Sequence, residues 1–133
     1  MLYCAGPYSL QAVNVFAEFF KDNITNEDVW WWQSWNGHYH ALSHRMTPSN
    51  REDNFVGGHA FSEHITRGWQ EAITPAYTKT LELAGGGTMR ITRRERPQLL
   101  RDGITGAPTV LYNAVSGAKG DLPFTFSQRL GST

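Results

Sequence analysis

The chain has 133 residues, 40% of them hydrophobic, and its 12 Lys and Arg residues balance its 12 Asp and Glu residues. This length and apolar content suit a single domain with a packed core and exclude a disordered tail. Because basic residues are not in excess and no stretch reaches the length of a membrane span, we expect neither a nucleic-acid partner nor a membrane span.

Aromatic residues make up 13% of the chain, and it contains 13 glycines and a single cysteine, Cys4. The aromatic and glycine content favours an all-β fold with many turns. A lone cysteine excludes an internal disulfide framework.

The first predicted elements are a mixed segment, a hairpin and a loop. Residues 8–21 fit a strand that leads into an irregular segment or a short helix. Residues 27–46 predict a hairpin, because two alternating runs flank Asn36-Gly37, a pair suited to the positive φ angles of a tight turn. Residues 47–54 are polar and contain a proline, as expected of a surface loop.

The remaining chain repeats strands and turns. Residues 56–62 predict a strand whose glycines allow close approach of another backbone or a ligand. Residues 62–69 predict a hairpin connection, with Trp69 starting the return strand. Further strands are expected at residues 76–83, 88–92, 95–101, 108–115 and 124–130. We therefore predict an all-β fold of antiparallel hairpins.

A weak internal repeat relates residues 28–44 to residues 95–113. Each stretch has an acidic residue, an apolar strand, a glycine turn and a second apolar strand. The acidic residues are Asp28 and Glu95, 67 positions apart (95 minus 28), which is too far for one hairpin. Repeated antiparallel units of this kind are typical of a propeller or a sandwich.

Three stretches carry a resemblance to a known family. They are residues 27–32 (Glu-Asp-Val-Trp-Trp-Trp) with 37–44, residues 57–62 (Gly-Gly-His-Ala-Phe-Ser), and residues 93–99 (Arg-Arg-Glu-Arg-Pro-Gln-Leu). In them the chain resembles the five-bladed β-propeller glycoside hydrolases of families 43 and 32, over roughly residues 27–115. The first carboxylate motif of that family is not found upstream of Asp28. The resemblance therefore implies that residues 1–133 are a single domain corresponding to the C-terminal part of a propeller.

The resemblance also implies roles for two carboxylates. In such propellers the innermost strand of successive blades begins with a carboxylate that points into a central funnel, where the sugar binds. Asp28 resembles the residue that tunes the pKa of the acid and orients it, and Glu95 resembles the general acid. Protonating a leaving oxygen near neutral pH needs a carboxyl with a raised pKa, which burial and a neighbouring charge provide. Val29 is a departure, because the family usually has proline there.

Further residues are candidates for contacts with the sugar. Tryptophan rings stack on sugar faces, although core packing is the alternative for Trp30. His38 and His40 share a strand face within reach of one metal ion, but we favour hydrogen-bonded histidines and expect no metal and no cofactor. The arginines could instead form a salt-bridged strand edge. The predicted substrate-binding residues are Trp30, His40, His44, His59, Arg94 and Arg96.

Two functions follow as hypotheses. The first is a carbohydrate-active propeller that cleaves or binds a glycan in its funnel, with Asp28 and Glu95 as catalytic residues. The alternative is a non-catalytic structural or interaction subunit, in which both carboxylates are structural and pair with Arg94, Arg96 or His40. A third carboxylate near both would favour the first hypothesis, because glycoside hydrolysis needs two carboxylates in separate roles.

Expectations about partners and location follow from the same reading. A partial propeller has open sheet edges, so we expect other protein chains or a missing N-terminal segment to complete it. A glycosylation sequon at Asn23-Ile24-Thr25 and the family resemblance favour a secreted or extracellular protein, although residues 1–7 lack the features of a signal peptide. Apolar faces that would need covering include Val13, Val15, Phe16, Phe19 and Phe20.

Overall fold

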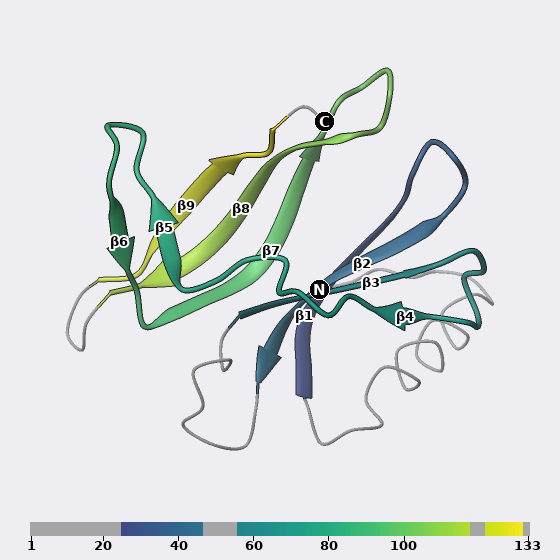
Figure 1. The fold of residues 1–133 in the computed structure, drawn as a ribbon, viewed down its shortest axis with the longest axis horizontal. Helices are drawn as coiled ribbons and strands as arrows, with labels where there is room; N and C mark the ends of the chain where they lie inside the picture. Colours follow the sequence, from purple (N-terminus) through teal and green to yellow (C-terminus); the bar gives the residue numbers. More distant parts are fainter. Residues whose placement is uncertain (1–24, 47–55, 118–121, 132–133) are drawn as a thin grey trace.

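The computed structural model of the chain describes residues 25–46, 56–117 and 122–131 (Figure 1). These residues form nine strands and no helix, and every pair of neighbouring strands is antiparallel, which confirms the all-β prediction. It follows that this part of the chain contains no helix able to cross a membrane. The elements expected at residues 8–21 and 47–54 lie outside the described residues.

The first sheet is a four-stranded meander. Its strands, in spatial order, are β1 (Thr25–Gln33), β2 (Tyr39–Met46), β3 (Val56–Ser62) and β4 (Gln70–Glu71). β1 and β2 form the predicted hairpin, and their connection is the five residues 34–38, with Gly37 at φ 86°. β3 has the predicted bounds.

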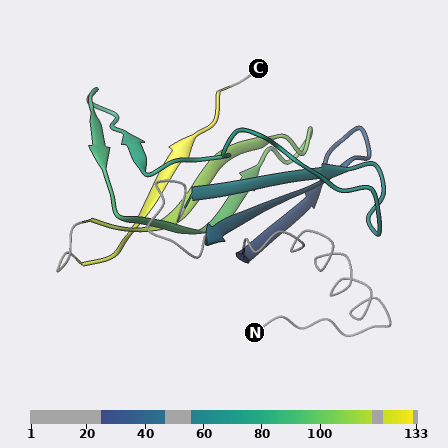
Figure 2. The ribbon, with the colours of Figure 1, turned by 60° about the horizontal axis from the view of Figure 1, so that its bottom comes forward.

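The second half of the chain forms two further sheets. β5 (Thr80–Glu82) and β6 (Thr88–Arg90) make a two-stranded hairpin, and β7 (Arg93–Arg101), β8 (Pro108–Ser116) and β9 (Phe124–Arg129) make a three-stranded meander. Figures 1 and 2 show the β5–β6 hairpin beside β9. The described sheets are open: none of the three closes into a barrel or a ring.

The strand expected at residues 76–83 is only three residues long, and the reason lies in β3. The backbone N–H of Gly57 donates to the carbonyl of Tyr77, and the N–H of Ala76 donates to the carbonyl of Gly57, both at 2.9 Å. Because these backbone groups bond to β3, they cannot extend the pairing between β5 and β6. The segment before β5 therefore joins the first sheet to the second half of the chain.

The two long hairpins share one irregularity. The pairing register shifts between Glu27 and Trp30 in β1 and between Glu95 and Gln98 in β7, so that two residues oppose one on the partner strand. Each is therefore a β-bulge, which bends the strand and changes the direction of its side chains. Pro97 lies in the second bulge, one of the few places where a strand tolerates proline.

The bulges establish the register of the internal repeat. Glu27 and Glu95 occupy the same place, immediately before each bulge, and Asp28 and Arg96 follow them with φ angles of 53° and 51°. The repeat offset is therefore 68 positions (95 minus 27). The sequence-based pairing of Asp28 with Glu95 was wrong by one residue.

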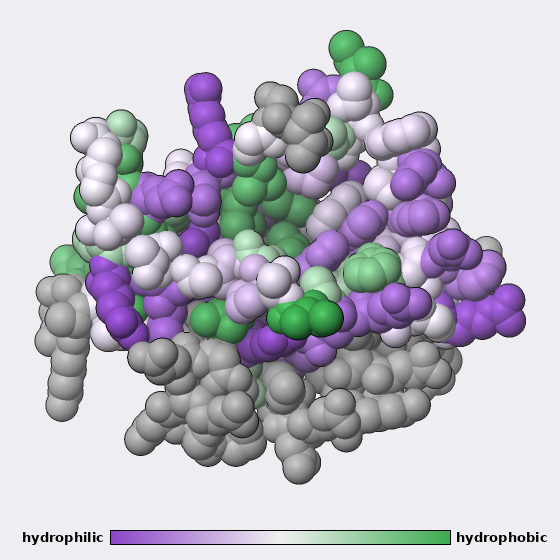
Figure 3. Space-filling view, in the orientation of Figure 1, coloured by the Kyte–Doolittle hydropathy of each residue, from purple (hydrophilic) through white to green (hydrophobic). Residues whose placement is uncertain are grey.

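Two clusters of buried side chains hold the sheets together. β7 lies against β1, β2 and β3, so the three-stranded sheet packs on one face of the first sheet (Figure 2). Apolar surface gathers over β7 and β8, whereas the side of β3 and β4 is mainly polar (Figure 3). The cluster between the two large sheets contains Trp32, Leu42, Tyr77 and Leu111. The cluster beneath the β5–β6 hairpin contains Leu81, Ile91 and Val115.

A substitution at Gly57 tests the contact between Tyr77 and β3. A Cβ atom at Gly57 would lie 2.4 Å from Cδ1 of the Tyr77 ring, a distance that forces the ring or the strand to move. We expect Gly57→Ala to lower the free energy of unfolding by about 1–3 kcal/mol, measured by urea denaturation. Gly103→Ala is the control, because a Cβ there meets nothing within 4 Å. Equal stability of the two variants would show that this contact is absent.

Candidate functional site

The two bulges bring three carboxylates close to one buried histidine. His44 is 1% exposed, and burial lowers the pKa of its ring below the ordinary value of 6.5. The charges of Glu95, Asp28 and Glu27 act in the opposite direction, and the charge of Arg93 acts with burial. We call Glu27, Asp28, His44 and Glu95 the carboxylate cluster.

The two predicted catalytic residues differ in their surroundings. Asp28 is exposed, whereas the side chain of Glu95 is 17% exposed and forms an ion pair with Arg93. The charges of both carboxylates act on the same two groups, His44 and Tyr77. Burial raises the pKa of Tyr77, so its hydroxyl stays protonated. The region therefore places carboxylate acceptors, which can bind the hydroxyl groups of a ligand, beside a buried imidazole and a buried phenol whose hydroxyl donates to the carbonyl of Ser43 (3.3 Å).

Two of the predicted histidines belong to an aromatic stack. Trp32 stacks on His40 and on His59, with ring centroids 5.0 Å and 6.1 Å apart, and the His40 and His59 rings are nearly coplanar, with centroids 5.4 Å and planes only 3° apart. His40 is paired with Phe61 in the neighbouring strand, so His59 is its diagonal neighbour. Diagonal pairs in a sheet are within reach of large side chains.

A hydrogen-bond chain runs through the same histidines. Nδ1 of His40 lies 3.2 Å from Nε2 of His59, and Nε2 of His40 lies 3.1 Å from Oγ of Ser34 in the β1–β2 connection. Burial lowers the pKa of both His40 and His59. Both rings are therefore mostly neutral at neutral pH, and one nitrogen of each can accept a proton.

The two predicted arginines lie in different environments. Arg96 is exposed in its bulge, whereas Arg94 is 1% exposed and lies over the rings of Tyr77 and Phe126. The side chain of Arg94 reaches a ligand only if its present bonds change. Its acceptors are Oδ1 of Asn113 (2.9 Å), the carbonyl of Thr78 (3.2 Å) and Oε1 of Gln128 (2.9 Å).

The predicted site residues thus fall into three places. Trp30, His40, His44 and His59 share one face of the first sheet, as the pairing register shows. His40 and His44 are four residues apart, or about 13 Å along a strand. The carboxylate cluster and the histidine stack are therefore separate, and Arg94 lies inside the second sheet.

Three residues at these places are not among the predicted site residues: Glu27, Ser34 and Trp32. A signal for Trp32 existed, because a hairpin centred on residues 34–38 places it opposite His40. Glu27 directly precedes Asp28 in the sequence, and only the register of the bulge shows that it lies opposite His44. Ser34 gave no signal beyond its place beside the turn.

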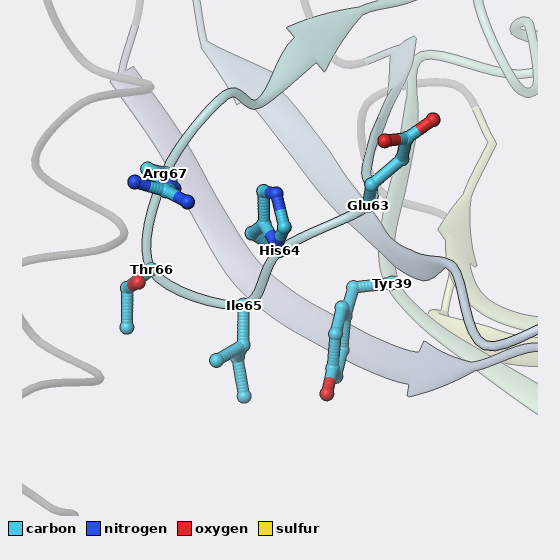
Figure 4. A pocket seen from close by; sticks show the side chains of 6 residues that line it. All are labelled: Tyr39, Glu63, His64, Ile65, Thr66 and Arg67. Atoms are coloured by element: carbon cyan, nitrogen blue, oxygen red, sulfur yellow. The ribbon is translucent and has the colours of Figure 1, made fainter.

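The structure also contains a pocket of about 320 Å³ that no predicted site residue lines (Figure 4). It lies at the β3–β4 connection, beside Tyr39 at the start of β2, whereas His44 lies near the other end of that strand. Its walls are Tyr39, Glu63, His64, Ile65, Thr66 and Arg67. Across residues 25–46, 56–117 and 122–131, no group of three or more His, Cys, Asp or Glu side chains is placed to hold a metal ion.

Comparisons with known proteins gave no match, whether to a family model, to a curated protein or to a solved structure. The site is therefore interpreted from its own geometry.

The lowered pKa of His44 predicts how stability depends on pH. The folded protein binds this proton more weakly than the unfolded chain does, so stability is lost as the pH falls through 6.5 towards the lower folded pKa. We expect the free energy of unfolding, measured by urea denaturation, to fall between about pH 7.5 and about pH 5.5. His44→Asn should reduce this dependence, and the exposed His64→Asn should not. An unchanged dependence in His44→Asn would contradict the assignment.

Proposed function

We propose that this chain is a carbohydrate-active module of the propeller type, with a sugar site at the carboxylate cluster. The observation that carries the proposal is the pair of matching bulges, each immediately preceded by a glutamate. Asp28 and Arg96 adopt a left-handed backbone that costs such residues roughly 1–2 kcal/mol. Strain of this kind is concentrated at functional sites, because the surrounding structure must maintain it.

The packing of the two large sheets supports a propeller arrangement. The face of the first sheet that carries Trp32 and Leu42 packs on the face of the second sheet that carries Leu111. The counterpart of Trp32 at the repeat offset is Leu100, and the counterpart of Leu42 by pairing register is Tyr112, which lies opposite Gln98 as Leu42 lies opposite Trp30. Leu100 and Tyr112 are 53% and 37% exposed, and the second sheet is covered on its other face, at Leu111. The sheets therefore pack head to tail, and repetition of such a contact generates a ring or a filament.

The chemistry proposed for the site uses two carboxylates that differ in solvent exposure. Glu95 is largely enclosed and would act as the acid that protonates the leaving oxygen, while the exposed Asp28 would orient the acid and the sugar. Glu27 is a third carboxylate whose charge reaches the same histidine. Trp30, 39% exposed on the same face, offers a ring on which a sugar could stack.

Hydrolysis of nitrophenyl glycosides of common pentoses and hexoses tests the proposal, together with calorimetric titration of the matching oligosaccharides. We expect Glu95→Gln and Asp28→Asn to lower the hydrolysis rate by about 100-fold or more. Trp30→Ala should weaken binding about tenfold, the effect of losing one stacked ring. Glu63→Gln, an exposed carboxylate at the β3–β4 connection, is the matched control. A folded protein that neither binds nor cleaves any of these sugars would exclude the proposal.

The alternative is a non-catalytic structural subunit, and one observation favours it. Arg93 and Arg94, next to Glu95, are both engaged within the protein, one with Glu95 and one with three oxygens around it. Side chains whose charges are paired within the protein can have a purely structural role. Binding of a glycan without hydrolysis, unaffected by Glu95→Gln, would support this alternative.

The exposed face of the second sheet provides a test of the head-to-tail arrangement. We expect the purified chain to self-associate, because Leu100 and Tyr112 are uncovered among the described residues and a second copy can cover them. Leu100→Asp should shift the sedimentation coefficient towards that of a monomer. Ile104→Asp, at a hairpin position that is 96% exposed, should not. A folded monomer at all concentrations would contradict the arrangement.

A further inference from the structure

We propose that Ser34, His40 and His59 form a nucleophilic relay that transfers acyl groups from esters, a site distinct from the carboxylate cluster. The distances are those of a nucleophile, its base and the group that orients the base: 3.1 Å from Oγ of Ser34 to Nε2 of His40, and 3.2 Å from Nδ1 of His40 to Nε2 of His59. The three residues come from the β1–β2 connection, β2 and β3.

The stack fixes the orientation of the base. The Trp32 ring lies against both imidazoles, with centroids 5.0 Å from His40 and 6.1 Å from His59, and the nearly coplanar rings of His40 and His59 meet at their edges through the 3.2 Å nitrogen contact. The stacking and the edge contact together limit the rotation of the His40 ring. A ring held in this way presents Nε2 to Ser34 and Nδ1 to His59 without a further loss of side-chain entropy. His59 is in turn close to the ring of Phe61, with centroids 6.0 Å apart.

Two arrangements of protons fit the same distances. Ser34 Oγ also lies 2.6 Å from Oδ1 of Asn36 and 2.9 Å from the carbonyl of His38, so in the resting turn it can donate to either while His40 donates to Oγ. When the His40 proton is on Nδ1 and donated to His59, Nε2 becomes the acceptor for the Ser34 hydroxyl. The reactive form is the second arrangement.

The reaction balances with water as the only co-reactant. The Ser34 Oγ–H bond breaks and its proton passes to Nε2 of His40, while Oγ forms a bond to the carbonyl carbon of the ester. The carbon–oxygen bond to the alcohol then breaks, and the departing oxygen takes the proton from His40. Water repeats the sequence on the acyl-serine, releasing the acid and restoring Ser34.

The surroundings of Ser34 suggest the class of ester. Ser34 is partly exposed and the adjacent Trp35 is 83% exposed, so the nucleophile lies at the surface next to an aromatic ring. Such a setting suits a small acyl group on an alcohol with a flat or apolar face. His40 acts as the base, and His59 is a positioning residue that acts through His40.

The test is covalent labelling of the full chain by a fluorophosphonate probe, with the adduct located by peptide mass spectrometry, and turnover of nitrophenyl acetate. We expect one adduct, on Ser34, and a loss of about 100-fold in labelling rate in His40→Phe, which keeps a ring for the stack. The rate in the unaltered protein should fall as the pH is lowered through the pKa of His40, which lies below 6.5.

Variants of His59 separate positioning from packing. His59→Gln keeps an acceptor for His40 and should retain most of the labelling, whereas His59→Phe keeps the aromatic ring and should lower the rate and shift its pH profile. Ser127→Ala, at an exposed serine of β9, should label as the unaltered chain does. A folded protein left unlabelled at Ser34, or equal labelling in His40→Phe, would overturn the relay. Neither result bears on the sugar site proposed at the carboxylate cluster, which contains none of Ser34, His40 and His59.

Discussion

Burial of one guanidinium constrains much of the described structure. Arg94 is 1% exposed, and removing a charge from water costs several kcal/mol unless hydrogen bonds replace the solvent. Its acceptors come from β8, from β9 and from Thr78 in the segment before β5, so the charge is tolerated only while all three stay in place. The same segment carries Tyr77, which packs on Gly57 of β3. One buried cation thus links the second large sheet, through Thr78, to the segment that packs on β3 of the first sheet.

The strands were predictable because their signals are local. Alternation of apolar residues and turn residues such as Asn36-Gly37 placed most of them within a few positions. The bulges were not predictable, since one extra residue changes the facing of side chains and leaves the composition unaltered. Strict alternation would put Arg94 and Arg96 on one face. The bulge that begins at Arg96 leaves Arg94 buried and Arg96 exposed.

The candidate sites were predictable only in part, for the same reason. His40 and His44 are four residues apart on one strand, which was enough to place them on one face. The contact between His40 and His59 depends on the register between β2 and β3, and no local pattern encodes that register. The partnership of Ser34 with His40 depends on how the β1–β2 connection folds back. Residues that meet across strands therefore had to come from the structure.

The equivalence of the two large sheets explains why one apolar face is buried and its counterpart is open. Trp32 and Leu42 are 8% and 6% exposed because the second sheet covers them, while Leu100 and Tyr112, at the same places of the repeat, have no such cover within the described residues. Covering apolar surface contributes about 25 cal/mol per Å², so a few hundred Å² amounts to several kcal/mol, comparable to the stability of a whole domain. The same packing that buries Trp32 and Leu42 thus leaves the matching face of β7 and β8 open among the described residues.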